Sequence, residues 1–417
     1  MCPKDEFKVG RPTSDGTCVY AGLRLADGKE VAVKCMLTDN CEHLAENETQ
    51  IYNMLHMETS PHVVRYLHYR PEATFTYIVL ELCEFSLTEY VNRARDDPQI
   101  PFDPQKIIRE ILTGLKILHK QGNEGMILHR DLKPDNVLVD VRWNIRLADF
   151  GVSKRVGEGR STNYTSGKGN AEWQAAESIP IDGENQPVVY KRKSDIQVAG
   201  MLSFYVLTKG KHPFGDISYE RPNNIYRGNP VSLDTLTDSV ERDFVSWLLH
   251  NNIDDRPSAE EALTHPYLKS IDDQFHFLVE MGNEPEIKGN THCYVVEKLN
   301  NIRHKTRKDY PNGWKAKIQP SQILDGMCMH PHQYNDNITS LLRFLRNVKA
   351  HIHDPSHSSE IVRQHVGEPA SYFLHRDRFS TLPMRVHKIL RKQAKRVPQS
   401  GGDEDVWINR STLKSFF

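Results

Sequence analysis

The sequence predicts an α+β protein, in which a small sheet that carries one helix is followed by mainly helical segments. Strand-like apolar runs stand at 30–35 (EVAVKC) and 76–82 (TYIVLEL), and a helical stretch lies between them at 46–56. From Asp103 onward, apolar residues recur mostly at helical spacing. The length of 417 residues exceeds one typical core, so we expect two domains.

Composition and charge exclude several classes of protein. The hydrophobic fraction of 38% and the charged fraction of 26% are typical of soluble globular proteins. A net charge of -1 argues against a protein that binds polyanions over its whole surface, so any contact with nucleic acid must come from a local patch. The charged amino terminus and the lack of a long apolar run predict no membrane contact from this chain and a cytoplasmic location, or the cytosolic face of a membrane if the chain is tethered.

The seven cysteines contain no CxxC pair, which favours reduced thiols. Two helical segments close on glycine: QKIIREILTGLKILHKQG at Gly122 and KSDIQVAGMLSFYVLTKG at Gly210. The second segment is apolar on nearly all sides, so we expect a buried central helix. The first organised block ends near Ser270, and the text from Pro398 is typical of a solvated tail. The predicted division is therefore a first domain at 1–270, a second at 271–397 and a tail at 398–417.

Three motifs in the first domain indicate phosphoryl transfer. ILHRDLKPDNVLV occupies 127–139, LADFG occupies 147–151, and VAVK stands at 31–34. Transfer of a phosphoryl group needs an acceptor hydroxyl held in line, metal ions that offset charge on the phosphate oxygens, and a cation on the nucleotide. Together the motifs resemble those of the eukaryotic protein kinases, and this resemblance implies a bilobal protein-kinase fold.

The resemblance also implies a role for each residue of the kinase site. Asp131 would orient the attacking hydroxyl and accept its proton, and Lys133 would steady the transferred phosphate. Lys34 would bind the phosphates of ATP with an acidic partner, for which the helical register favours Glu48 over Glu46; an exposed helix carboxylate is the alternative interpretation. Asn136 and Asp149 would hold Mg²⁺, and the other nucleotide-binding residues would be Gly10, Gly16, Val19, Ala32, Leu80, Glu81 and Cys83.

The first domain also departs from the kinase pattern in its phosphate-covering loop. VGRPTSDGTCVYAG has proline and polar residues where a middle glycine would let the backbone approach the phosphates. Lys133 indicates the serine/threonine class, and Glu177 is expected to pair with a buried Arg256. The candidate phosphorylation sites, which would pair with Arg130 once modified, are Ser161, Thr162, Thr165 and Ser166.

One predicted helix of the second domain carries reactive side chains on its polar side. Arg343, Asn347 and His351 recur every four residues, with Arg346 at their flank. Lys349 interrupts the apolar stripe, so we expect the helix to end or distort near it. From periodicity alone, an amphipathic surface helix with a solvated histidine is the plainer interpretation. The apolar face consists of Ile338, Leu341, Leu342, Leu345, Val348 and Ile352.

The order of motifs after the kinase block resembles a nuclease domain. YNDNITSLLRFLRNVKAHIHD, followed later by VGEPASYF, is similar to the kinase-extension nuclease domain of ribonuclease L and of the inositol-requiring enzyme, the kinase/endoribonuclease of the unfolded protein response. The resemblance runs from about residue 5 to residue 396 and implies an all-α second domain. Ribonuclease L also carries ankyrin repeats and the stress sensor a membrane span, and this sequence shows neither.

Carried onto this sequence, the nuclease residues would be Tyr334, Arg346, Asn347 and His351. RNA can be cut without a metal because its own 2′-hydroxyl can attack the adjacent phosphate, so the protein supplies proton transfer and stabilisation of the pentavalent phosphate. Histidine has an ordinary pKa near neutrality, so His351 would protonate the leaving 5′ oxygen. Tyr334 would act at the 2′-hydroxyl, and Arg346 and Asn347 would bind the phosphate. The products would be a 2′,3′-cyclic phosphate and a 5′-hydroxyl, with no cofactor for the nuclease.

The adjacency of the two sets of motifs motivates the leading hypothesis, a dual enzyme in which ATP or ADP in the kinase site favours a homodimer, or a higher homo-oligomer, that assembles the RNA site. The basic run at 298–317, which includes Tyr310 and Trp314 for stacking, is the candidate RNA patch; a solvated loop is the alternative. Two other functions fit the sequence. One is a serine/threonine kinase with a non-catalytic helical docking extension, and the other is a nucleotide-sensing scaffold.

Overall fold

The computed structural model divides by its internal contacts into two units, Met1–Leu263 and Thr264–Phe417. Each unit is described by itself. The residues that the structure describes are 9–12, 18–25, 27–37, 45–52, 60–120, 125–156, 162–165, 171–179, 188–289, 293–301, 313–327 and 334–394.

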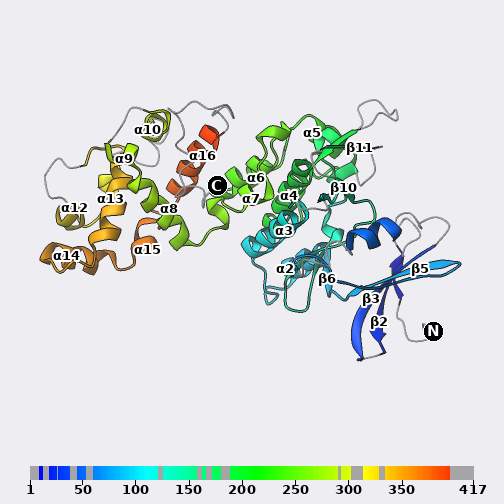
Figure 1. Ribbon diagram of the computed structural model, residues 1–417. Coiled ribbons are helices and arrows are strands. Elements are labelled where there is room, and N and C mark those ends of the chain that lie inside the picture. The colour runs from blue at the N-terminus through cyan, green and yellow to red at the C-terminus, as the bar shows by residue number, and fades with distance from the viewer. Residues whose placement is uncertain are drawn as a thin grey trace. The chain divides into compact units, whose positions relative to one another are not determined.

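The first unit begins with an antiparallel sheet of five strands in the order β1-β2-β3-β5-β4 (Figure 1). Its central strand β3 buries Val31 and Val33, as expected of β-branched residues on a pleated surface. The helix predicted at 46–56 is helical over the described residues 45–52, and 53–56 lies outside them. The strands are β1 (Val9–Pro12), β2 (Cys18–Arg24), β3 (Lys29–Leu37), β4 (Tyr66–Pro71) and β5 (Phe75–Glu81).

The rest of the first unit is mainly helical. In α4 every residue from Ser194 to Val206 is buried, which confirms the predicted central helix. The helices are α2 (Leu87–Asp96), α3 (Pro104–Leu118), α4 (Arg192–Leu207), α5 (Arg221–Tyr226), α6 (Ser239–Leu248) and α7 (Ala259–Ala262). Short strands form three small sheets: β6 (Phe85–Ser86) with β8 (Val137–Val139) and β9 (Ile145–Leu147), β7 (Met126–Leu128) with β10 (Lys154–Val156), and β11 (Thr162–Thr165) with β12 (Val188–Lys191).

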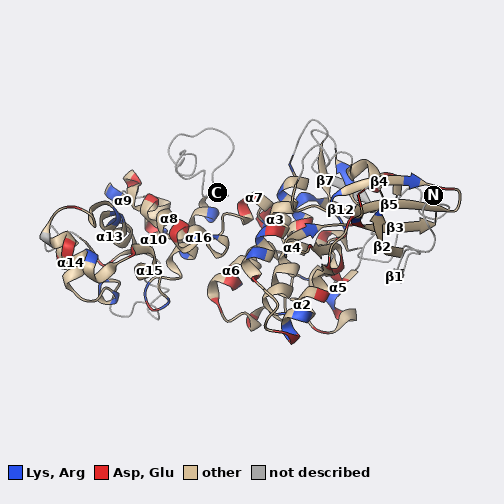
Figure 2. Cartoon of the chain, turned by 90° about the horizontal axis from the view of Figure 1, so that it is seen from below, with Lys and Arg blue, Asp and Glu red and all other residues tan. Residues whose placement is uncertain are grey.

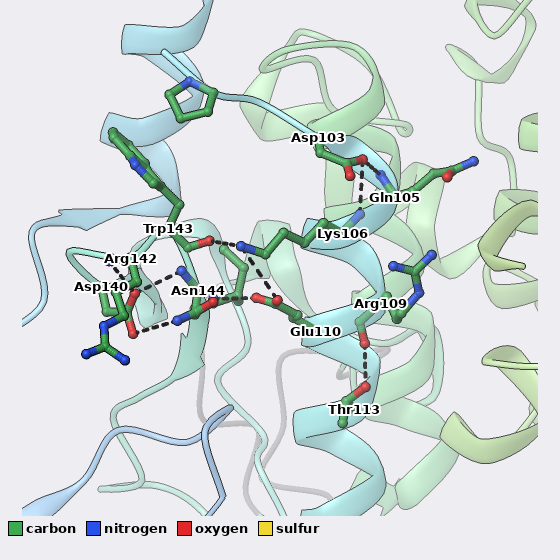
Figure 3. Close-up of polar contacts among 12 residues, drawn as sticks. Asp103, Gln105, Lys106, Arg109, Glu110, Thr113, Asp140, Arg142, Trp143 and Asn144 are labelled. Carbon is green, nitrogen blue, oxygen red and sulfur yellow. Dashed lines mark hydrogen bonds and ion pairs between the residues drawn. The ribbon is translucent and has the colours of Figure 1, made fainter. Parts of the chain in front are cut away.

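The amino end of α3 is fastened to the hairpin of β8 and β9 (Figure 3). Asp103 caps the helix. Lys106 Nζ donates a hydrogen bond to the carbonyl of Trp143 at 2.8 Å, and Glu110 accepts one from the N–H of Ile145 at 2.7 Å. Because this hairpin joins the motif at 127–139 to the motif at 147–151, the contacts hold both motifs against α3.

A buried ion pair joins two segments of the helical part of the first unit, as the sequence predicts. The side chain of Arg256 has no exposed surface, and its Nη1 and Nη2 donate to the two carboxylate oxygens of Glu177, each at 2.8 Å. Arg256 Nε also donates to the carbonyl of His250 at 2.6 Å. The guanidinium is therefore neutralised and hydrogen-bonded, as a buried charge must be.

Over its described residues the second unit is all-helical, and the predicted α+β class of the chain is confirmed. Its helices enclose one apolar core that includes Phe344 and Phe373. None of the helices that the structure describes has the length and hydropathy that crossing a bilayer requires. The helices are α8 (Ile271–Asn283), α9 (Pro285–Gly289), α10 (Tyr294–Asn300), α12 (Gln322–Met327), α13 (Ile338–His351), α14 (His357–Val366), α15 (Pro369–Phe373) and α16 (Leu382–Ala394).

The predicted apolar face of α13 is confirmed, because all of its residues are buried. Phe344 is buried as well, which the sequence did not predict. The helix continues through Lys349 without a break and ends at His351. Lys349 is exposed, so it lies beside the apolar stripe and does not interrupt it.

Replacement of Arg256 by Met should lower the free energy of unfolding by about 3 kcal/mol, because it leaves the carboxylate of Glu177 without its charged partner. Urea unfolding followed by tryptophan fluorescence measures the change. Lys116→Met is the matched control, since the pair of Lys116 with Glu260 is largely exposed and its loss should change stability by no more than about 0.5 kcal/mol. Equal effects of the two replacements would contradict the structural role of Arg256.

Candidate active sites

Lys34 lies between two carboxylates in the first unit. Its Nζ donates hydrogen bonds to Glu48 Oε2 at 2.7 Å and to Asp149 Oδ1 at 2.8 Å. The side chain of Glu48 is fully buried, whereas that of Asp149 is 42% exposed. Glu48 therefore holds the lysine from the interior, and Asp149 presents its second oxygen toward solvent.

Burial and mutual attraction set the charges of these three groups. Burial lowers the pKa of Lys34, but the charges of Asp149 and Glu48 outweigh it and hold that pKa above its usual value. Burial raises the pKa of Asp149, and the charge of Lys34 with its hydrogen bond outweighs this and lowers the pKa to about 2. Burial raises the pKa of Glu48, and Lys34 offsets only part of that rise. Lys34 is therefore cationic and Asp149 anionic at neutral pH.

The catalytic-loop motif brings three side chains together. Lys133 Nζ donates to Asp131 Oδ2 at 2.9 Å, and Asn136 Nδ2 donates to the same oxygen at 2.8 Å. Because the amide nitrogen of Asn136 faces Asp131, its amide oxygen is the group left for a cation. Carboxylate and amide oxygens are the ligands that Mg²⁺ accepts, usually with nucleotide phosphates completing the shell, so Asn136 and Asp149 fit this metal.

Asp195 of α4 holds the backbone of the catalytic loop. Its fully buried carboxylate accepts hydrogen bonds from the N–H groups of His129 and Arg130 at 3.0 and 3.1 Å, and from the Tyr190 hydroxyl at 2.6 Å. His119 Nε2 lies 2.8 Å from it. Arg130 has a φ of 70°, a conformation that costs free energy for any residue with a side chain. Asp195 stabilises this conformation. The residue was not predicted, because its only sign in the sequence is an acid inside an apolar helix.

Aromatic contacts join the helix after β3 to the catalytic loop. Tyr52 meets Phe150 edge-on with ring centroids 5.2 Å apart, and Phe150 lies 5.1 Å from His129. Asn47 Nδ2 donates to three backbone carbonyls of the segment 150–153, at 2.9 to 3.3 Å. The segment that carries Asp149 is thus tied to the helix that carries Glu48.

The remaining predicted nucleotide-binding residues lie mostly on the sheet. Val19 is on β2, and Ala32 on β3 lies opposite Leu80 on β5. Gly10 is described only as backbone of β1, and Gly16 lies outside the described residues.

Glu81 and Cys83 follow at the end of β5. The Glu81 carboxylate accepts a hydrogen bond from the N–H of Arg65 at 2.7 Å and pairs with Arg146 at 2.9 Å, so its side chain serves the fold. Burial raises the pKa of the Cys83 thiol to about 12, so this thiol is protonated at neutral pH. Of the candidate phosphorylation sites, Thr162 and Thr165 are described only as backbone of β11, and Ser161 and Ser166 lie outside the described residues.

A continuous chain of hydrogen bonds forms the second candidate site, in the second unit. Arg346 Nε donates to Asn283 Oδ1 at 2.9 Å, and Arg346 Nη1 donates to Asn347 Oδ1 at 2.8 Å. Asn347 Nδ2 donates to the hydroxyl of Tyr334 at 2.6 Å. Three of the predicted nuclease residues are therefore joined, and Asn283, which the sequence analysis missed, holds the guanidinium from the neighbouring helix.

His351 lies one helical turn beyond Asn347. Its Nδ1 is 2.8 Å from Asp354 Oδ2, and its side chain is 52% exposed. Within the part of the chain that the structure describes, Nε2 has no hydrogen-bond partner, so it faces solvent. A carboxylate beside one ring nitrogen fixes the orientation of the ring and places the proton on that nitrogen. Asp354 was also missed, although an acid three residues after a histidine is visible in the sequence.

Two aromatic residues near these hydrogen-bonded side chains are buried. Tyr334 is only 2% exposed and packs edge-on against Phe344 with ring centroids 5.5 Å apart. Trp314 is also buried, and its indole Nε1 donates to the carbonyl of Asn335 at 3.1 Å. The prediction that Trp314 stacks on RNA is therefore wrong, because its ring belongs to the core. Most of the predicted basic patch, including Tyr310, lies at 302–312, outside the described residues.

Gly282 allows α8 to approach α13 closely. A Cβ at this position would lie 2.4 Å from the carbonyl oxygen of Leu342 and 2.9 Å from Cβ of Arg346, distances that real contacts do not reach. Only glycine fits between the two helices here. This approach brings the next residue, Asn283, within hydrogen-bonding distance of Arg346.

The sheet, the catalytic loop and the Lys34 cluster define the first unit as a protein kinase domain. Residues 8–268 match the family model described as protein kinase domain, and residues 274–399 match the model described as Ribonuclease 2-5A. The chain therefore belongs to the protein kinase family, in the branch that joins the kinase to a Ribonuclease 2-5A domain.

The chain is similar to known proteins over most of its own length. The chain is 31% identical to the "Serine/threonine-protein kinase/endoribonuclease ire-1" of Caenorhabditis elegans, over 93% of this chain and 39% of the relative. It is also 31% identical to the "Serine/threonine-protein kinase/endoribonuclease IRE2" of Homo sapiens, over 94% and 41%. Identity with the "Sensor for unfolded proteins in the ER ire1" of Schizosaccharomyces pombe is 26%, over 91% and 37%. The chain thus spans about two fifths of the length of these relatives.

Gly282→Ala should destabilise the second unit by about 1–3 kcal/mol, because the added methyl group forces α8 and α13 apart. Thermal unfolding measures the loss, and binding of an ATP analogue to the first unit serves as the control, since it should keep its affinity. Unfolding of the variant at the wild-type temperature would show that the helices have room for the methyl group.

Proposed function

We propose that the chain is a dual enzyme: an ATP-dependent serine/threonine kinase that phosphorylates itself, and a metal-independent endoribonuclease. The observation that carries the nuclease proposal is the hydrogen-bonded chain of Asn283, Arg346 and Asn347, with the exposed ring of His351 one turn away. The names of the nematode and human relatives support the dual activity. The name of the fission-yeast relative supports a role in the response to unfolded proteins.

In the kinase half, the chain's own residues place the acceptor and the nucleotide. The hydroxyl oxygen of a serine or threonine forms a bond to the γ-phosphorus, the bond to the ADP oxygen breaks, and Asp131 accepts the hydroxyl proton. Lys133 contacts the same carboxylate and steadies the transferred phosphate, while Lys34 binds the nucleotide phosphates. Mg²⁺ held by Asn136 and Asp149 would offset negative charge on the phosphate oxygens.

In the nuclease half, the 2′-hydroxyl of RNA attacks the adjacent phosphorus and the bond to the 5′ oxygen breaks. Arg346 and Asn347 bind the non-bridging oxygens of the phosphate. The hydrogen bonds of Arg346 to Asn283 and Asn347 hold its guanidinium in place, and its remaining N–H groups face the phosphate. His351, in its doubly protonated form, gives the Nε2 proton to the leaving oxygen, and the carboxylate of Asp354 beside Nδ1 stabilises the positive charge of the ring. The products are a 2′,3′-cyclic phosphate and a 5′-hydroxyl.

Tyr334 takes a different role in this proposal from the one that the resemblance implies. It is 2% exposed, and its hydroxyl accepts a hydrogen bond from Asn347. A side chain so deeply buried reaches the RNA through its neighbour, so Tyr334 orients the amide of Asn347. The 2′ proton then passes to water.

We infer that nucleotide in the kinase site favours a homodimer in which the RNA site is completed. The consecutive placement of the two domains in one chain supports this coupling. A ligand shifts an equilibrium only toward the state that it binds better, so the nucleotide must bind the dimer better than the monomer. Sedimentation of the protein with and without an ATP analogue should show a larger dimer fraction with nucleotide. An unchanged dimer fraction would contradict the coupling.

His351→Ala should lower the rate of RNA cleavage by at least about a hundredfold, because general acid catalysis typically contributes that much. The assay follows cleavage of a stem-loop RNA by the full chain with an ATP analogue, and EDTA should leave the wild-type rate unchanged once the analogue is bound. Asp131→Asn is the reciprocal control: it should abolish phosphate incorporation into the protein and leave RNA cleavage intact when the analogue is supplied. Full cleavage by His351→Ala would remove the nuclease proposal and favour a kinase with a docking extension.

A further inference from the structure

A basic pocket lies beside the hydrogen-bonded chain of the second candidate site. Its volume is about 420 Å³, and it is lined by Gly282, Lys288, Arg343, Arg346 and Asn347. Three of these five residues are cationic. No acidic residue is among the described residues that line it. Its lining residues come from α8, α9 and α13, and α13 contacts both of the other helices (Figures 1 and 2).

The side chains of two of these cations, Lys288 and Arg343, make no polar contact with the side chains or backbone that the structure describes. Within the described residues, the side chains of Lys288 and Arg343 make neither a hydrogen bond nor an ion pair; Lys288 is exposed and Arg343 is half-buried. Arg346, in contrast, is fixed by Asn283 and Asn347. Cations held close together without acidic partners raise the local potential and bind phosphate, for which the guanidinium fork is well shaped.

The order of residues along α13 gives the pocket a direction on the RNA. Arg343, Asn347 and His351 are four residues apart, so each step moves about 6 Å along the helix axis. In the proposed reaction His351 faces the leaving oxygen, which belongs to the nucleotide on the 3′ side of the cut. Arg343 lies on the opposite side of Asn347, so it faces the nucleotide on the 5′ side, which carries the attacking 2′-hydroxyl.

We propose that Arg343 and Lys288 bind the phosphate immediately upstream of the scissile phosphate, and this inference rests on the proposed nuclease function. A phosphate held in this pocket fixes the ribose whose 2′-hydroxyl attacks, because that ribose lies between the two bound phosphates. The enzyme then requires a phosphate on the 5′ side of the nucleotide at which it cuts. This requirement favours cleavage inside an RNA strand over cleavage after an unphosphorylated first nucleotide.

A protein–RNA double-mutant cycle tests the assignment. The substrate is a stem-loop RNA whose cut site has been mapped with the wild-type chain, made with one neutral methylphosphonate immediately upstream or immediately downstream of the scissile phosphate. For wild type, the upstream replacement should lower kcat/KM by about tenfold, the loss expected of one charge-assisted hydrogen bond. Arg343→Met should lose about as much on unmodified RNA and lose no more on the upstream-modified RNA.

Two further variants make the result specific. Lys288→Met, on a different helix, should show the same coupling to the upstream phosphate, which keeps the test valid if Arg343→Met folds poorly. Lys349→Met is the matched control, because Lys349 is exposed on α13 but does not line the pocket; it should keep the full tenfold discrimination.

The outcomes separate this inference from the function on which it rests. Coupling of Arg343 and Lys288 to the downstream phosphate, or independent losses from protein and RNA changes, would overturn the assignment while RNA cleavage itself stands. A wild-type chain that cuts RNA but is indifferent to the upstream replacement would overturn it as well. A wild-type chain that cuts no RNA would remove the proposed nuclease function, and the subsite with it.

Discussion

The close contact between Gly282 and the backbone of α13 is the constraint on which the second candidate site depends. Nothing larger than hydrogen fits between the two helices at this point. The contact sets the position of Asn283, which fixes Arg346, which in turn fixes Asn347. Each of these side chains would otherwise sample several rotamers, and the ordering cost is met by packing of helices and not by the substrate. In the proposed nuclease, a site built on two packed helices would therefore offer RNA a preformed guanidinium and amide.

The kinase domain meets a different constraint, that of charges inside the fold. A buried carboxylate is costly unless donors surround it. Asp195 has such donors in the backbone of His129 and Arg130, and that same arrangement holds the left-handed turn before Asp131. For Glu48 the donor is Lys34, which also donates a hydrogen bond to Asp149. The interior carboxylates thus fix the geometry of the exposed ones, so that the second carboxylate oxygen of Asp149 faces solvent.

The sequence alone predicted much of this arrangement, for physical reasons that also explain what it missed. Helical periodicity identified the buried face of α13 and the largely buried α4, because burial imposes a spacing on the chain. Periodicity cannot show which side chain of another helix meets the polar face. Asn283 is 63 residues from Arg346, and only the packing of α8 on α13 brings them together. The prediction that Trp314 stacks on RNA was wrong for a related reason: a run of charged residues does not show which of its members has a buried side chain.

The two candidate sites meet the same electrostatic problem, negative charge on phosphate, with different sets of side chains. The kinase site presents oxygens of Asp149 and Asn136, which hold hard cations well and repel phosphate unless a cation lies between. The nuclease site presents guanidinium, amide and imidazole nitrogens, which bind phosphate oxygens directly and are poor ligands for Mg²⁺. A chain with a net charge of -1 can still offer a local phosphate-binding surface, because three cations and no acidic residue are among the described residues that line the pocket of the second unit. This difference in side chains is why chelation of metal should separate the two proposed activities, even though both would act on phosphorus.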